Sequence, residues 1–161
     1  MKQPFERIVS AYGAMVLRVC RAVLGTQSDA DDAWSETFLA ALRSWPDLAA
    51  DANVEAWLVT IAHRKAIDIT RGNRRRPTPV EEVPDRVSTI GTPGAGDRDL
   101  WAAVKTLPDK QRQAVAYHYL AGLPYRQVAD IVGGSPDAVR RAAADGIKAL
   151  RATVRKVDGD G

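Results

Sequence analysis

The sequence predicts an all-α protein made of two small helical domains joined by a flexible linker. Apolar residues recur at steps of three and four along most of the chain, which is the spacing of amphipathic helices, and no alternating strand pattern of useful length occurs. Between residues 77 and 98 this periodicity stops, and Pro, Gly, Ser and Thr are interleaved with acidic residues. Such a segment cannot bury enough apolar surface to fold. We therefore expect domains at 1–76 and 99–157 and a linker at 77–98.

Three helices are expected in the first domain. The first should end at Gly25, because glycine commonly follows the last helical residue. Ser28 is a good N-cap for the second helix, and Pro46 should stop it. Asn53 should cap the third, which is expected to fray near Gly72. The buried stripe of the second helix is predicted to contain Trp34, Phe38, Ala41, Leu42 and Trp45.

The second domain should contain a helix around residues 100–107, another from Pro108 through Tyr119, and a final pair at 124–132 and 136–154. A turn of two glycines and Ser135 joins the pair, which has the layout of a helix-turn-helix. In that motif the second helix enters the major groove of DNA. A plain helical hairpin with solvated arginines is the alternative, and we favour DNA binding.

Charge is distributed unevenly along this chain of 161 residues with a net charge of +3. From residue 28 to 55 there are seven acidic residues and one arginine, whereas from 63 to 76 there are six basic residues and one aspartate. This asymmetry favours two partners, one that meets an acidic surface and one that is polyanionic. The basic run is either a phosphate track or a solvated helix end.

The sequence contains no pattern that indicates catalysis, a cofactor or a metal. Cys20 is the single cysteine, so it cannot form an internal disulfide. His63 and His118 fall in different predicted domains, and the acidic cluster at 29–32 lacks the glycine and glutamate of a calcium loop. No apolar run approaches a membrane span, and no secretory signal is visible. We expect a cytoplasmic protein that is not an enzyme and does not insert into a membrane.

Three motifs resemble the extracytoplasmic-function sigma factors of bacterial RNA polymerase. DADDAWSETF (29–38) resembles their region 2.2, and WLVTIAHRKAID (57–68), followed by arginines, is similar to regions 2.3 and 2.4. LPDKQR (107–112) and YLAGLPY (119–125) resemble region 4. Three motifs in this order and spacing are far more specific than any one of them.

The resemblance implies a sigma factor that binds the β and β′ subunits of core RNA polymerase, directs it to specific promoters and assists promoter melting. It also implies a pocket for a flipped base at about 47–53, an anti-sigma factor as partner, and a monomer when no partner is bound. The implied polymerase-binding residues are Asp29, Asp32, Ser35 and Glu36. The candidate DNA-binding residues, from the resemblance and from the helix-turn-helix, are Asn53, Arg64, Lys65, Arg71, Arg74, Arg75, Arg76, Ser135, Arg140, Arg141 and Lys148.

Some positions depart from the family pattern. Ser35 stands where glutamine is usual and Arg64 where asparagine is usual. Ala142, Asp145 and Ile147 occupy places in the recognition helix where members often carry basic residues, so weak reading of the minus-thirty-five element is expected. Two alternatives remain open: a conventional helix-turn-helix regulator that acts without core polymerase, and a polymerase-binding adaptor with a degenerate region 4.

Overall fold

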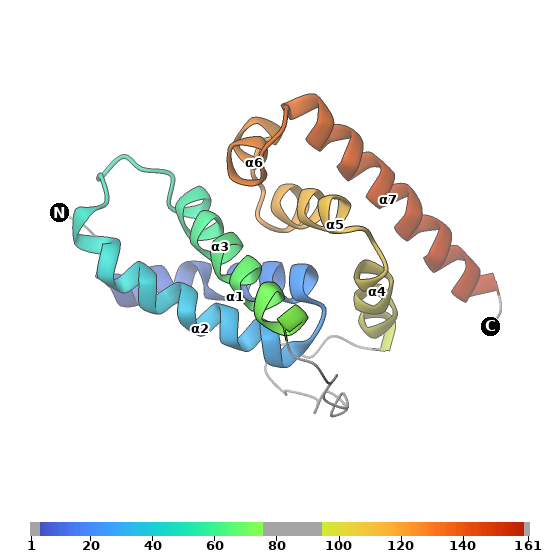
Figure 1. The fold of residues 1–161 in the computed structure, drawn as a ribbon, viewed down its shortest axis with the longest axis horizontal. Helices are drawn as coiled ribbons and strands as arrows, with labels where there is room; N and C mark the ends of the chain where they lie inside the picture. Colours follow the sequence, from blue (N-terminus) through green and yellow to red (C-terminus); the bar gives the residue numbers. More distant parts are fainter. Residues whose placement is uncertain (1–3, 76–94, 160–161) are drawn as a thin grey trace.

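The computed structural model describes residues 4–75 and 95–159, and every regular element within these stretches is helical (Figure 1). The predicted linker therefore lies almost entirely outside the described residues. The elements are α1 (Phe5–Leu24), α2 (Gln27–Ser44), the 3-10 helix η1 (Trp45–Asp47), α3 (Val54–Arg75), α4 (Ala95–Lys105), α5 (Asp109–Val115), the π-helical turn η2 (Ala116–Leu120), α6 (Tyr125–Val132) and α7 (Pro136–Gly159).

The N-terminal unit packs α1, α2 and α3 against one another. As expected, α1 ends at Gly25, which has the left-handed φ of 83° that glycine adopts most readily. The Asn53 side chain accepts a hydrogen bond from the backbone amide of Ala56, which confirms it as the cap of α3. Between the three helices lies a cluster of buried residues: Ile8, Val16, Cys20, Ala30, Ala33, Phe38, Ala41, Leu58 and Ala62.

Two expectations for α2 are wrong. The N-cap is Thr26, not Ser28, and its hydroxyl accepts a hydrogen bond from the Asp29 amide at 3.2 Å. Leu42 is 51% exposed, because the buried stripe passes through Phe38 and Ala41 and the helix turns Leu42 outward. Trp45 is half-buried and lies in η1 rather than in α2.

The third helix does not fray at Gly72 but continues to Arg75. Its last turns are tied to other elements. The Asn73 side chain donates a hydrogen bond to Asp29 of α2 at 2.9 Å, and Arg74 pairs with Asp109 of α5 at 3.7 Å. These contacts offset the low helix propensity of glycine at this exposed position.

The C-terminal unit packs α4, α5 and α6 against the long helix α7. The helices α5 and α7 approach each other closely at Gly146, where an added Cβ would lie 2.7 Å from the Val115 side chain of α5. The absence of a side chain at Gly146 therefore lets α5 and α7 approach closely. The buried apolar residues of this unit include Leu107, Ala114, Leu123, Val128, Val139, Ala143 and Leu150.

A π-helical turn follows α5, where the periodicity predicts a continuous α-helix through Tyr119. The wider turn changes which side chains point inward. Tyr117 is 1% exposed, whereas Tyr119 is 55% exposed.

The two units lie against each other rather than apart. In Figure 1, α1 runs behind α3 and the C-terminal unit lies alongside both, and α1 contacts α4, α5 and η2 while α3 contacts α6. Val19, Val23, Val59 and Ala66 of the N-terminal unit belong to the same buried cluster as the C-terminal core.

Candidate functional surfaces

The outward face of α2 combines acidic and apolar side chains. Asp32, Ser35 and Glu36 are all exposed, as the sequence predicts for a docking face. Leu39 and Leu42 follow them at helical spacing and are 55% and 51% exposed. The two leucines thus form a small exposed apolar area beside the acidic side chains. Leu39 was not among the residues predicted from the sequence, although its spacing from Ser35 and Leu42 places it on this face.

Asp29 occupies a different environment from the other three predicted polymerase-binding residues. It is half-buried at the start of α2, and its carboxylate accepts the hydrogen bond from Asn73. Within this structure Asp29 therefore joins α2 to α3.

Basic side chains gather along α3. Arg64, Arg71 and Arg74 are exposed, and Lys65 is half-buried. Arg75 is the last residue of α3, and Arg76 lies outside the described residues. At the other end of α3, the Asn53 amide donates a hydrogen bond of 3.4 Å to the Gln127 side chain of α6.

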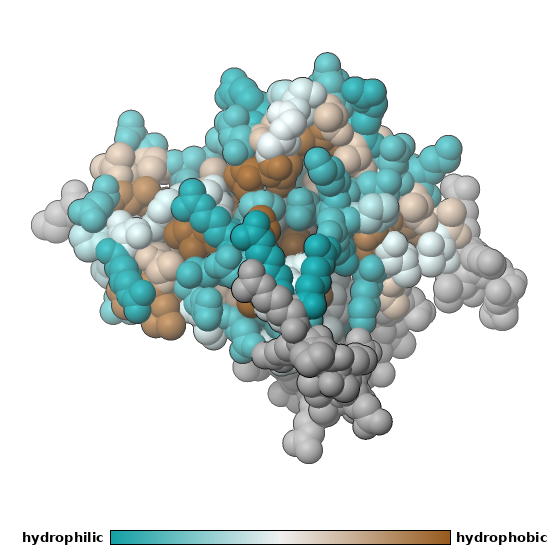
Figure 2. Space-filling model, in the orientation of Figure 1, coloured by the Kyte–Doolittle hydropathy of each residue, from teal (hydrophilic) through white to brown (hydrophobic). Residues whose placement is uncertain are grey.

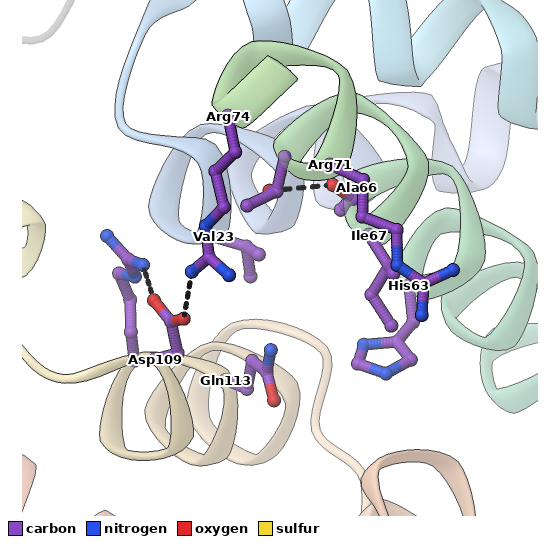
Figure 3. A pocket seen from close by; sticks show the side chains of 10 residues that line it. Val23, His63, Ala66, Ile67, Arg71, Arg74, Asp109 and Gln113 are labelled. Carbon is purple, nitrogen blue, oxygen red and sulfur yellow. Dashed lines mark hydrogen bonds and ion pairs between the residues drawn. The ribbon is translucent and has the colours of Figure 1, made fainter.

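A pocket of about 150 Å³ lies where α1, α3 and α5 meet (Figure 3). His63, Arg71 and Arg74 line it from α3, and Asp109 and Arg112 line it from α5. Asp109 pairs with both Arg74 and Arg112, so two guanidinium groups share one carboxylate. The predicted basic run thus faces the C-terminal unit in this arrangement.

The helix-turn-helix consists of α6, a turn and α7. The turn uses left-handed glycines with φ of 88° at Gly133 and Gly134. The Ser135 hydroxyl accepts a hydrogen bond from the Ala138 amide at 3.1 Å, which confirms it as an N-cap. Arg141 and Lys148 are exposed on α7.

Arg140 is held in place by its neighbours, which the sequence analysis did not anticipate. It pairs with Asp137 at 3.0 Å, and its guanidinium lies 5.8 Å from the centre of the Tyr125 ring. Tyr125 in turn stacks on His118 at 3.9 Å between ring centres. Burial and a hydrogen bond with Tyr119 raise the pKa of Tyr125. This aromatic group orients Arg140 beside the N-terminus of the recognition helix.

Three titratable side chains are largely buried: Cys20, His63 and Tyr117. Burial raises the pKa of the Cys20 thiol to about 12 and also raises that of Tyr117. Burial, with a smaller effect of Arg64, lowers the pKa of His63. Among the described residues, no group of His, Cys, Asp and Glu side chains could hold a metal ion.

Figure 2 shows that hydrophilic side chains cover most of the face in view, with apolar residues visible only in patches. In the described part of the chain, none of the helices is long and apolar enough to span a membrane.

Comparison with known proteins identifies both units. Residues 8–76 match the model of Sigma-70 region 2, and residues 97–150 match that of Sigma-70 region 4. The chain is 28% identical over 156 residues to the ECF RNA polymerase sigma factor SigK of Mycobacterium tuberculosis, a match that covers 91% of this chain and 81% of SigK.

Solved structures share this fold. The fold resembles the sigma factor RpoE of Bartonella quintana, solved with the anti-sigma factor NepR, with a TM-score of 0.78 at 18% identity over 94% of this chain and 96% of that one. It also resembles the extracytoplasmic function sigma factor SigJ of Mycobacterium tuberculosis, with a TM-score of 0.59 at 26% identity over 88% of this chain and 52% of SigJ.

These matches confirm the family and the fold class that the sequence predicts, and they do not favour a conventional helix-turn-helix regulator or a degenerate adaptor. Sigma factors are transcription regulators rather than enzymes. The chain belongs to the extracytoplasmic-function sigma factors of the sigma-70 family, which direct RNA polymerase to promoters.

Proposed function

We propose that the outward face of α2 binds core RNA polymerase. The observation that carries this proposal is the combination of Asp32 and Glu36 with the exposed Leu39 and Leu42 on one helix face. Carboxylates provide orientation and fast association, and the leucines provide apolar area that binding would remove from water. In the family this segment meets the clamp helices of the β′ subunit. Ser35 lies within the same face.

Promoter DNA would be bound by both units, with 1–76 acting on the minus-ten element and 99–157 on the minus-thirty-five element. The basic side chains of the first unit would hold the DNA strand: Arg64, Lys65, Arg71 and the arginines at 74–76. The 47–53 segment, which includes Asn53, would form the pocket for a flipped base. In the recognition helix, Arg141 and Lys148 are available to phosphates, whereas Arg140 is already paired. Ser135 would contribute mainly by capping the helix.

The proposed setting follows from this role. The protein would act in the cytoplasm as a monomer when free, without membrane insertion, cofactor or catalysis of its own. Its partners would be the β and β′ subunits, promoter DNA and an anti-sigma factor of the kind seen bound to RpoE.

The test of the polymerase surface is a charge reversal. We expect Asp32→Lys with Glu36→Lys to keep the helical circular dichroism but to lower affinity for core polymerase roughly tenfold or more, because like charges across an interface cost several kcal/mol. The control reverses Glu6 and Asp130, two exposed acids outside this face, and changes the net charge equally. Equal affinity of both variants for core polymerase would remove α2 from the interface.

The test of the basic run uses salt. With the holoenzyme formed first, Arg74, Arg75 and Arg76 are replaced by alanine and promoter affinity is measured across a salt series. Each lost phosphate contact should reduce the slope of log affinity against log salt by roughly 0.7 to 0.9. Replacing Arg7 and Arg18, exposed on α1, should leave the slope unchanged. A fall in affinity without a change in slope would mean that the three arginines do not contact phosphates.

A further inference from the structure

The pocket where α1, α3 and α5 meet has an excess of positive charge (Figure 3). Arg71 and Arg74 line it from α3, and Arg112 lines it from α5. Among the described residues in its lining, Asp109 is the only acidic one, so three positive charges face one negative charge. A hollow lined mainly by one sign of charge concentrates ions of the opposite sign. This pocket therefore favours an anion.

The carboxylate of Asp109 does not neutralise the arginines of the pocket. It lies 3.7 Å from the Arg74 guanidinium and also pairs with Arg112. In Figure 3, Arg71 lies on the opposite side of the pocket from Asp109, and no described acidic side chain forms an ion pair with it. The positive charge of Arg71 is thus left for a ligand.

The Arg112 guanidinium has a buried donor without an acceptor. Its Nε atom is buried and has no hydrogen-bond partner, although the terminal nitrogens bond to Asp109 and, at 3.4 Å, to the carbonyl of Lys105. The Arg112 side chain is only 16% exposed. A buried donor that is left unpaired costs free energy, and in native proteins such a donor calls for a bound ion or water. An anion in the pocket beside Arg112 would supply the acceptor.

The neutral side chains of the pocket add hydrogen-bonding capacity without charge. The Nδ1 atom of His63 lies 2.7 Å from the Tyr117 hydroxyl, and burial lowers the pKa of His63, so the imidazole adds no positive charge at neutral pH. Gln113 lines the pocket from α5, and its amide has two N–H donors. The charge of the site therefore comes from the arginines and Asp109.

The size and charge of the pocket indicate the chemical class of the anion. Its volume of about 150 Å³ is below the roughly 300 Å³ at which pockets for drug-sized ligands begin, so it encloses one small group. Guanidinium groups match the oxygens of a phosphate in pairs. A phosphate ester carries a charge of about −1.5 to −2 at pH 7, which complements a site with two excess positive charges.

We propose that Arg71, Arg74 and Arg112 form a binding site for a phosphate group of a small molecule. The group would come from free phosphate or pyrophosphate, or from the end of a nucleotide whose base stays outside the pocket. Asp109 holds Arg74 and Arg112 in place. The site goes beyond the proposed function, in which Arg112 and Asp109 have no role. These two residues therefore test the site without altering the side chains assigned to DNA.

The experiment measures anion binding to the full-length protein by isothermal titration calorimetry. The probes are inorganic phosphate, pyrophosphate and ATP, each with EDTA and with the ionic strength held constant by sodium chloride. Arg112→Gln should weaken pyrophosphate binding roughly tenfold or more, because it removes a charged hydrogen-bond donor. Arg112→Lys, which keeps the charge but not the planar fork, should lie between this variant and the wild type.

The opposite change is expected at Asp109. Asp109→Asn should tighten pyrophosphate binding by roughly two- to fivefold, because it removes a negative charge beside the anion and keeps an oxygen acceptor for the arginines. An ion-pair cluster with a purely structural role would show no such gain. The matched control is Arg126→Gln, which removes one positive charge at an exposed position of α6 and should leave the affinity unchanged.

The three probes distinguish the sources of the phosphate group. Tighter binding of ATP than of pyrophosphate would assign the site to nucleotides, and the reverse order would assign it to the free anion. Either order supports the site when Arg112→Gln weakens the binding. Thermal unfolding without ligand identifies any variant that has lost its fold, and Asp109→Asn then carries the test.

Three outcomes would overturn the proposal. One is the absence of saturable binding of all three probes by the wild type. Another is equal weakening by Arg112→Gln and Arg126→Gln, which would mean that the anion responds only to the overall charge of the protein. The third is a single-stranded oligonucleotide whose affinity falls with Arg112→Gln as much as that of pyrophosphate does, since Arg112 would then belong to a nucleic-acid surface.

Discussion

At the scale of the residue, Gly146 shows how one missing Cβ sets the packing of the C-terminal unit. Its backbone faces Val115, and a methyl group there would lie 2.7 Å from the nearest valine carbon. Gly72 is the opposite case, a helical glycine with nothing within 4 Å of its added Cβ. The two glycines therefore predict effects of opposite sign for the same substitution.

We expect Gly146→Ala to lower the free energy of unfolding by about 1–3 kcal/mol, because α7 must move away from α5. Gly72→Ala should raise it by up to about 1 kcal/mol, because alanine has the higher helix propensity and meets no neighbour. Urea denaturation followed by circular dichroism measures both. A Gly146→Ala protein as stable as Gly72→Ala would mean that the close approach of α5 and α7 is not required.

The role of an individual residue could be predicted from the sequence where its neighbours along the chain determine that role. It could not be predicted where tertiary contacts determine it. Asn53 and Ser135 were identified as caps because their side chains need only the next turn of the same helix. The partnership of His63 with Tyr117 could not be predicted, since 54 positions separate the two residues and each alone resembles an ordinary core side chain. Only the packing of the two units brings them together.

At the scale of the element, the start of α2 shows how two nearby residues can be suited to the same role. Both Thr26 and Ser28 are good caps, and both precede acidic residues. The αL conformation of Gly25 ends α1 and lets Thr26 adopt the extended backbone that an N-cap requires. The helix therefore starts two residues earlier than the sequence pattern predicts.

Thr26→Ala is expected to lower the free energy of unfolding by about 0.5–2 kcal/mol, because the Asp29 amide loses its acceptor. Ser28→Ala should change it by no more than about 0.5 kcal/mol, because Ser28 is an exposed residue in the first turn. Chemical denaturation of the two single variants gives the comparison. A larger effect at Ser28 than at Thr26 would contradict the cap seen in the structure.

The positions of the helices along the chain were largely predictable, but the side chains that each helix buries were not always predictable. Apolar spacing located the long helices, since each buries one stripe. The π-helical turn after Val115 changes that spacing, and Tyr117 is buried whereas Tyr119 is exposed. A single widened turn leaves no clear trace in the sequence, because the residues on either side remain good helix formers.

At the scale of the whole molecule, composition and motif order were enough to predict a two-unit helical sigma factor. They gave no information on how the units meet, because the apolar residues of the interface continue the same stripes that form each unit's own core. The Pro- and Gly-rich segment at 77–98 indicated separate domains, and the structure adds that their described parts share buried surface.

This shared surface predicts the behaviour of the nicked protein. The composition of 77–98 favours cleavage there by a nonspecific protease, giving fragments that end near Arg76 and begin near Arg98. Because Val23, Ala66 and Tyr117 are buried between the units, separation would expose apolar surface to water. We therefore expect the two fragments to co-elute in gel filtration at high micromolar concentration and to separate on dilution.

The same cleavage of the Tyr117→Phe variant should give fragments that separate at higher concentration than those of the wild type, because the hydrogen bond between His63 and Tyr117 no longer contributes to their association. The Tyr119→Phe variant, altered at an exposed position, should behave as the wild type does. Wild-type fragments that elute apart at every concentration would show that the linker, rather than the interface, keeps the units together. Co-elution that is independent of both tyrosines would assign the association to the apolar contacts alone.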